Sequence, residues 1–245
     1  MKKLFFTLSL FTLGLADAQH HWGYEGSESP EHWGETEGNE KCNKSKAQSP
    51  INIPTSAVIA KKATKMEFHY DTGDVKDIID NGHTLQFDFN EGNYVTHNNK
   101  KYFLLQFHAH EESEHTVDGI RYPLELHFVH KALDGSVLVI GVMAKEGLEN
   151  SYFEKLKVFK NLAKNGKEDT DIIFNPEKMF PHNKAYYTYS GSLTTPPCSD
   201  NVTWILFKTP IEMTEDEIKD IANHLPKSNN RPIQPLNGRV VSGTK

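Results

Sequence analysis

The 245-residue sequence has only two cysteines, no long run of lysine or arginine, and no apolar stretch longer than residues 4–15. Two cysteines allow one intramolecular disulfide at most. The lack of basic runs, together with a net charge of −6, excludes a phosphate-backbone partner, so we expect no nucleic acid. An apolar stretch of twelve residues is too short to cross about 30 Å of hydrocarbon, so we expect no membrane span.

The N-terminal residues have the three parts of a secretory signal. Lys2 and Lys3 form a positive start, residues 4–15 form an apolar segment, and Ala16 and Ala18 mark a small-residue cleavage site. We therefore expect residues 1–18 to be a cleaved signal peptide, with a membrane anchor as the alternative. Residues 19–245 would then be the mature chain of a periplasmic or secreted protein.

The two cysteines lie far apart in the sequence, at Cys42 and Cys198. Two cysteines in an oxidising compartment tend to pair, so export predicts a disulfide between them. Two free or intermolecular thiols are the alternative. The bridge would hold the N-terminal segment against the Thr-Thr-Pro-Pro sequence that precedes Cys198.

The rest of the chain predicts one sheet-dominated domain. Its composition, with 37% hydrophobic and 11% aromatic residues, is typical of a large globular domain, and no repeat or linker divides residues 19–245. The segment 19–65 has little periodicity and is expected to be irregular. Runs rich in β-branched and aromatic residues, separated by Gly-containing turns, predict strands at 68–70, 84–89, 102–110, 124–130 and 137–144.

Two peripheral helices are expected, at about 152–164 and 215–224. The second has a clear start signal, since Thr214 at the N-cap and Glu217 three residues later form a capping box.

The thirteen histidines include three whose spacing predicts a common site. In a strand, His108 and His110 point to the same face, and His127 has the same parity in the strand expected at 124–130. The turn at Asp118-Gly119 allows these two strands to be antiparallel neighbours. Three neutral histidines from adjacent strands match a catalytic zinc site, in which the fourth tetrahedral position is left open.

Polar residues two positions away support this interpretation. Gln106 and Glu125 are placed to accept a proton from the outer ring nitrogen of a ligating histidine, which fixes its tautomer. An isolated His-x-His pair is more often solvent-facing or hydrogen-bonded, and spacing alone leaves copper or nickel open.

Two further blocks have chemical potential. In residues 189–198 two prolines constrain a loop in which Thr194 and Thr195 would be held near a ligand, although a bare Thr-Thr-Pro-Pro is usually a turn or linker. In residues 81–86, His83 opens a strand after a turn, and a lone histidine there is usually only surface.

Taken together, these blocks resemble the α-class carbonic anhydrases of the exported bacterial kind. The resemblance covers residues 21 to 241 and rests on motifs in the family's order, namely 21–26 with 30–33, 48–53, 81–84, 106–110, 113–116, 125–130, 189–197 and 230–235. It implies a carbonic anhydrase catalytic domain over 19–245. It also implies a fold of about ten strands in a large, twisted, mostly antiparallel sheet.

The resemblance also implies roles for individual residues. His108, His110 and His127 match the family's Zn²⁺ ligands, with Gln106 and Glu125 as their outer partners. Matching positions make Thr194 a gatekeeper that donates to Glu114, Thr195 a bicarbonate-binding residue and His83 the proton shuttle, and they form an apolar wall for CO₂ from Val129, Val139, Leu193, Val202 and Trp204.

The implied activity is the reversible hydration of carbon dioxide to bicarbonate and a proton, by attack of zinc-bound hydroxide. The partner is then a small molecule, and the family resemblance suggests a homodimer. The alternatives are a catalytically inactive binding module on the same fold, a metal-storage protein, and a zinc esterase activity as a side reaction of the same site. No separate Ser–His–acid arrangement is apparent.

Overall fold

The computed structural model of the protein describes residues 22–62, 66–70 and 74–244. The expected signal peptide, residues 1–18, lies outside the described residues. Within the described ranges, no helix is long and apolar enough to cross a membrane.

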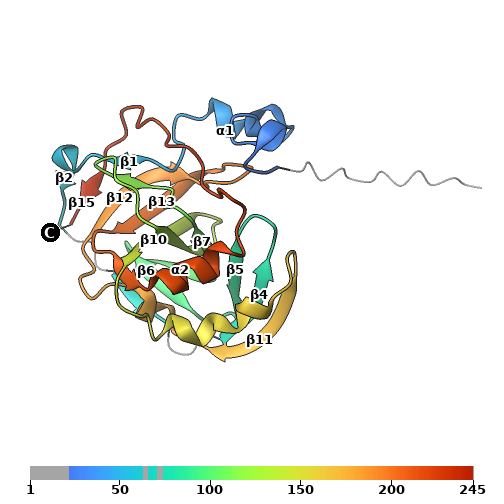
Figure 1. Ribbon diagram of the computed structural model, residues 1–245. Helices are drawn as coiled ribbons and strands as arrows, with labels where there is room; N and C mark the ends of the chain where they lie inside the picture. The colour runs from blue at the N-terminus through green and yellow to red at the C-terminus, as the bar shows by residue number, and fades with distance from the viewer. Residues whose placement is uncertain (1–21, 63–65, 71–73, 245) are drawn as a thin grey trace, which may run out of the picture.

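One large sheet organises the described chain, and thirteen strands within the described residues belong to it (Figure 1). Ten of them form a continuous path: β11 (Lys167–Ile173), β4 (Asp74–Asp80), β5 (Leu85–Phe89), β7 (Lys100–His110), β9 (Leu124–Lys131), β10 (Val137–Glu146), β13 (Asp200–Phe207), β12 (Tyr186–Ser192), β15 (Ser242–Gly243) and β2 (Ile59–Ala60). Off this path, β14 (Ile211–Met213) pairs with β10, and β3 (Met66–His69) reaches β7 through β6 (Tyr94–His97). The prediction of a mainly β fold is confirmed.

Most neighbouring strands are antiparallel, as expected. The pairs β10–β13, β10–β14 and β15–β2 are parallel, which makes the sheet mixed. A separate small sheet joins β1 (Asn52–Ile53) to β8 (Thr116–Val117), also in parallel.

The five strands predicted from the sequence all exist, each within about two residues of the predicted bounds. The remaining strands within the described residues were not predicted, namely β1, β2, β4, β6, β8, β11, β12, β13, β14 and β15. β11 is an edge strand whose residues are mostly exposed, so burial imposes little alternation on its sequence. The expectation of a loop from residue 189 is wrong for 189–192, which belong to β12 and pair with β13.

The helices agree in place but not always in type. The segment predicted at 152–164 contains the 3₁₀ helix η4 (Phe153–Asn161), and α2 (Glu215–Ala222) begins with the predicted capping box. The other helices are short: η1 (Gly26–Glu28), η2 (Trp33–Glu35), α1 (Lys41–Lys44), η3 (Thr55–Ala57) and η5 (Pro176–Met179). The first four fall in the segment expected to be irregular.

The central strands have a different core on each face. Phe87, Phe107 and Phe128 belong to one large aromatic core, which also includes buried residues of η4 and α2. In Figure 1 the red α2 and the yellow segment with η4 lie beside each other, and Lys160 of η4 is 2.6 Å from Asp220 of α2. Because these helices cover only the face with the aromatic core, they leave the opposite face of β7 and β9 uncovered.

The aromatic core predicts a large loss of stability on truncation. Phe107 is fully buried and its ring lies 4.5 Å from that of Phe87 and 5.0 Å from that of Phe128. Phe107→Ala should lower the free energy of unfolding by about 3–5 kcal/mol, measured by urea denaturation. Leu133→Ala is the control, because Leu133 is 94% exposed and its truncation removes no core contact. Equal losses in the two variants would contradict this account of the core.

Candidate active site

Three imidazole rings meet on the open face of β7 and β9. In the antiparallel pair, His108 lies directly opposite His127, and His110 is two residues further along β7. The ring centres are 5.0 Å apart for His108–His110, 5.2 Å for His108–His127 and 4.6 Å for His110–His127. One nitrogen from each ring lies within 4.8 Å of the others. The convergence predicted from the spacing is confirmed.

The outer nitrogen of each ring has a hydrogen-bond acceptor, which fixes the tautomer. His108 Nδ1 donates to Gln106 Oε1 at 2.8 Å, as expected from the sequence. His127 Nε2 donates to Glu125 Oε1 at 2.8 Å, also as expected. His110 Nδ1 donates to a backbone acceptor, the Asn229 carbonyl, at 2.6 Å. In the neutral form of each ring, the remaining nitrogen therefore carries a lone pair, and these nitrogens, Nε2 of His108 and His110 and Nδ1 of His127, face a common point.

Burial keeps two of the rings in the form that binds metal. It lowers the pKa of His108 well below the ordinary value, and the neighbouring histidines lower it further. Burial also lowers the pKa of His110. Both rings are thus neutral at pH 7, as metal ligation requires.

One buried atom provides a direct test of whether a metal fits. His110 Nε2 is inaccessible to solvent and has no hydrogen-bond partner among the described residues. Leaving a buried polar atom unpartnered is costly, and a cation at the point shared by the three rings would satisfy it. Three imidazole nitrogens are a donor set suited to zinc, so the residues present fit this group.

Glu125 connects the metal-facing rings to a buried polar chain. Its carboxylate also accepts from His115, at 2.7 Å from Nδ1 and 2.8 Å from the backbone nitrogen. His115 Nε2 in turn lies 2.5 Å from the Tyr189 hydroxyl, which donates to Ser49 Oγ. Burial raises the pKa of Glu125, but His115 and His127 lower it by more, so it lies well below its ordinary value. The buried carboxylate is therefore ionised and supports positive charge on the His127 side.

Glu114 places a second buried carboxylate at the three rings. Its Oε1 accepts from the backbone nitrogen of Arg231 at 2.8 Å, and its Oε2 lies 3.5 Å from His110 Nε2. Oε2 has no hydrogen-bond partner in the described part of the chain. The predicted hydrogen bond from Thr194, which is also buried, is therefore not formed in this structure.

The loop that contains Thr194 and Thr195 is constrained as expected. The predicted disulfide between Cys42 and Cys198 is present, with the Cα atoms 5.0 Å apart. The backbone nitrogen of Cys198 donates to the Thr195 carbonyl at 2.8 Å, and Gln48 Nε2 donates to the Cys198 carbonyl at 3.1 Å. The N-terminal segment thus holds the loop in place.

His83 shares a cavity with the converging rings. The cavity has a volume of about 100 Å³, and its lining includes His83, His108, His110 and Thr195. The His83 ring stacks on Trp22, with centres 3.8 Å apart and planes within 10°. His83 therefore faces the same cavity as two of the three converging rings.

The predicted apolar wall is divided between a cavity surface and the core behind it. Val129, Leu193 and Val202 line a cavity of about 690 Å³. Val202 is itself only 1% exposed and belongs to the same core cluster as Val139 and Trp204, which are 2% and 1% exposed. Unlike Val202, Val139 and Trp204 do not line this cavity. The Trp204 ring packs edge-on against His127, with centres 4.9 Å apart. These two residues support the wall and the ligand ring instead of contacting the open cavity.

The residue that the sequence analysis missed is Asn229. Its carbonyl accepts from His110, its Oδ1 accepts from the backbone nitrogen of Glu111 at 3.0 Å, and its Nδ2 donates to the carbonyls of Ala109 at 2.9 Å and His83 at 3.2 Å. No local pattern marks it, because the contact with His110 spans 119 residues. Only its position beside the motif at 230–235 is a signal.

Comparisons with known proteins find matches that cover most of the chain. The family model of eukaryotic-type carbonic anhydrases matches residues 28–245. A carbonic anhydrase of Pectobacterium atrosepticum is 37% identical over 226 residues, covering 90% of each chain.

Solved structures agree in fold. The α-carbonic anhydrase of Thermovibrio ammonificans, in complex with the inhibitor sulfanilamide, has a TM-score of 0.86 and 43% identity, covering 92% of this chain and 99% of that one. Dioscorin in complex with ascorbate has a TM-score of 0.85 and 27% identity, covering 91% of this chain and 97% of that one. Since the family model and the carbonic anhydrase relatives both span most of the chain, it belongs to the eukaryotic-type, or α-class, carbonic anhydrase family, whose reaction is the hydration of carbon dioxide.

Proposed function

We propose that the chain catalyses the reversible hydration of CO₂ with Zn²⁺ held by His108 Nε2, His110 Nε2 and His127 Nδ1. The observation that carries this proposal is the unpartnered, buried Nε2 of His110 at the point where the other two nitrogens converge. Three protein ligands leave one tetrahedral position open to a reactant. Zinc supplies hydroxide at neutral pH by lowering the pKa of water to about 7, a value established for carbonic anhydrases and not obtained from this structure.

Thr194 and Glu114 orient the nucleophile in this proposal. An ionised carboxylate can only accept hydrogen bonds, and Glu114 Oε2 has unused acceptor capacity within the described residues. A Thr194 hydroxyl that donates its proton there can only accept from the nucleophile. This polarity turns a lone pair of the nucleophile toward CO₂.

The apolar cavity surface formed by Val129, Leu193 and Val202 receives CO₂. An apolar wall suits a molecule without hydrogen-bond donors, and it does not hold the charged product. Thr195, at the edge of the cavity that contains His83, helps bind bicarbonate before water displaces it.

His83 moves the proton out of the site. An unperturbed imidazole titrates near pH 6.5, so it can take up and release a proton at working pH. Its cavity joins it to His108 and His110, and its ring lies against Trp22 without being enclosed by the core.

We also propose that the protein is exported, to the periplasm or outside the cell. Support comes from the signal-like residues 1–18 and from the disulfide, which forms most readily in an oxidising compartment. The homodimer suggested by the family resemblance stays a prediction.

A binding module without catalysis is the alternative. Dioscorin, whose solved structure is a complex with ascorbate, has a similar fold. The converging histidine set in this chain favours the enzyme. A metal-storage site would fill every metal position with protein ligands. Ester hydrolysis would be a side activity of the same nucleophile.

Metal removal tests the proposal as a whole. Stopped-flow CO₂ hydration should be abolished by treatment with a chelator and restored by stoichiometric Zn²⁺, because the hydroxide is supplied only by the bound ion. Elemental analysis should find one zinc per chain before chelation. Full activity in metal-free protein would contradict the zinc assignment, and zinc binding without turnover would favour the binding module.

Removal of the shuttle should affect proton transfer alone. His83→Ala should lower kcat in weak buffer by about tenfold or more, leave kcat/KM nearly unchanged, and recover with added imidazole. His182→Ala is the matched control, since His182 is an exposed histidine and lines none of the cavities described above. A His83→Ala variant with undiminished kcat would remove the shuttle role.

The gatekeeper role predicts a different pattern. Thr194→Ala should lower kcat/KM on the order of 100-fold while zinc content stays complete, because the nucleophile loses its orientation. Thr194→Ser keeps the hydroxyl and should retain most activity. If Thr194→Ala were as active as the original protein, the gatekeeper assignment would be wrong.

A further inference from the structure

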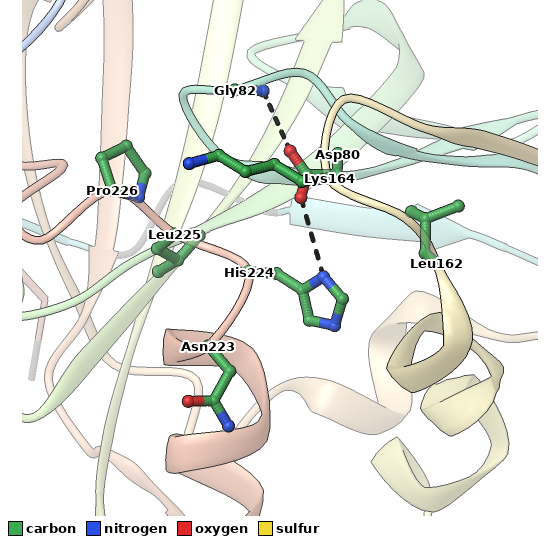
Figure 2. Close-up of a pocket in the computed structure, with 8 residues that line it drawn as sticks. All are labelled: Asp80, Gly82, Leu162, Lys164, Asn223, His224, Leu225 and Pro226. Carbon is green, nitrogen blue, oxygen red and sulfur yellow. Dashed lines mark hydrogen bonds and ion pairs between the residues drawn. The ribbon is translucent and has the colours of Figure 1, made fainter.

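A third cavity lies behind the loop that presents His83. It has a volume of about 170 Å³, and three segments meet around it: the end of β4, the chain after η4 and the chain after α2 (Figure 2). Asp80, the last residue of β4, is the buried charge in this cavity, with an exposure of 3%. A buried carboxylate is costly unless it is hydrogen-bonded or paired, so its contacts are informative.

The two oxygens of Asp80 have different partners. Oδ1 accepts from the backbone nitrogen of Gly82 at 3.0 Å, and Oδ2 lies 3.7 Å from His224 Nδ1. Figure 2 shows the carboxylate between these two groups. Asp80 therefore joins the turn that precedes His83 to a residue 144 positions away from it in the sequence.

His224 is a fixed anchor for this carboxylate. Its backbone nitrogen donates to the Ile221 carbonyl at 2.9 Å, which holds it at the end of α2. Its ring packs edge-on against Phe159 of η4, with centres 5.4 Å apart.

The loop itself has little freedom to adjust. Asn81 Oδ1 accepts from the backbone nitrogens of His83 at 3.0 Å and Thr84 at 2.9 Å. Gly82 has a φ of +80°, and a side chain there would approach Asn165 Oδ1 to 2.7 Å. On the other side of the loop, the His83 carbonyl accepts from Asn229 Nδ2. The direction in which the loop presents His83 is thus set by Asp80 from one side and by Asn229 from the other.

We propose that Asp80 and His224 are positioning residues for proton transfer: they hold the 81–84 loop so that the His83 ring faces the cavity it shares with His108 and His110. This inference rests on the proposed shuttle role of His83. Neither residue contacts a converging histidine, so they act on proton transfer and not on the hydration of CO₂. Proton transfer is sensitive to such placement because a donor and an acceptor must be within hydrogen-bond reach, directly or through water.

The test separates kcat from kcat/KM. Asp80→Ala removes both contacts, Asp80→Asn keeps an oxygen for the Gly82 nitrogen, and His224→Ala removes only the Oδ2 contact. In weak buffer, kcat of Asp80→Ala should fall about fivefold or more, with smaller losses in the other two, because misplacement by about 1 Å suffices for large rate effects. In all three, kcat/KM should stay near that of the original protein and imidazole should restore kcat.

Asp77→Asn is the matched control. Asp77 is also 3% exposed and lies on the same strand, but it pairs with Lys167 at 3.1 Å and does not contact the 81–84 loop. Its kcat in weak buffer should be unchanged, and so should its response to imidazole.

Combination with His83→Ala distinguishes positioning from general destabilisation. Adding Asp80→Asn or His224→Ala to His83→Ala should produce no further loss of kcat, because the two residues act through His83. A parallel fall of kcat and kcat/KM, a loss that persists without His83, or full kcat in both Asp80→Ala and His224→Ala would overturn the proposal.

If Asp80→Ala does not fold, the other two variants decide. If His83→Ala alone keeps full kcat, the shuttle assignment fails and the positioning role fails with it. If only His83→Ala loses kcat, the shuttle stands and the positioning role is wrong.

Discussion

The pairing of β7 with β9 is the constraint on which the site depends. His108 is opposite His127, and His110 is opposite Glu125, so one register sets both the ligand geometry and the acceptor that fixes the third ring. Side chains alternate with a period of two, so a slip of one residue would turn the rings of one strand into the aromatic core. The register is held from that other face: Phe107 lies opposite Phe128 in the same ladder, and both are fully buried. The large apolar area on one face thus specifies the polar geometry on the other.

Hydrogen bonds to the outer nitrogens fix the orientation of the three converging histidine rings. Each outer nitrogen has an acceptor, and the acceptors differ: a carboxamide for His108, a backbone carbonyl for His110 and an ionised carboxylate for His127. Only the last brings negative charge, and its own charge is stabilised by His115. Like charges on three adjacent imidazolium rings would repel, which is one reason why the pKa of His108 is so low. In the proposed zinc site, a divalent ion at the shared point would accept the lone pairs of the three neutral rings.

The sequence predicts well what depends on local alternation and poorly what depends on distant contacts. The parity of His108, His110 and His127, and the partners Gln106 and Glu125, follow from a period of two, because the two strands pair regularly from Gln106 to His110, beyond the register shift at Leu104/Gln106. Asn229 and the chain from His115 to Ser49 were not predicted, since their partners lie between about 74 and 140 residues away. Likewise the end of β12, with Ser190, Gly191 and Ser192, has the composition of a turn and is a strand because β13 supplies its hydrogen bonds. A glycine was needed there, because a side chain at Gly191 would lie 2.2 Å from Ser49 Oγ.

The same long-range contacts connect ligand geometry to proton transfer. The Asn229 carbonyl accepts from His110 Nδ1, and the Asn229 amide donates to the His83 carbonyl. One residue therefore contacts both a converging histidine and the loop that presents His83. A shift of the chain at 229 would therefore move a metal-facing ring and the shuttle loop together. The His83 ring stacks on Trp22, which belongs to the irregular N-terminal segment. The backbone of the loop is held by hydrogen bonds with Asp80, Asn81 and Asn229. On the proposed shuttle role, a fixed backbone lets the ring move between the cavity and solvent without shifting the three converging histidines.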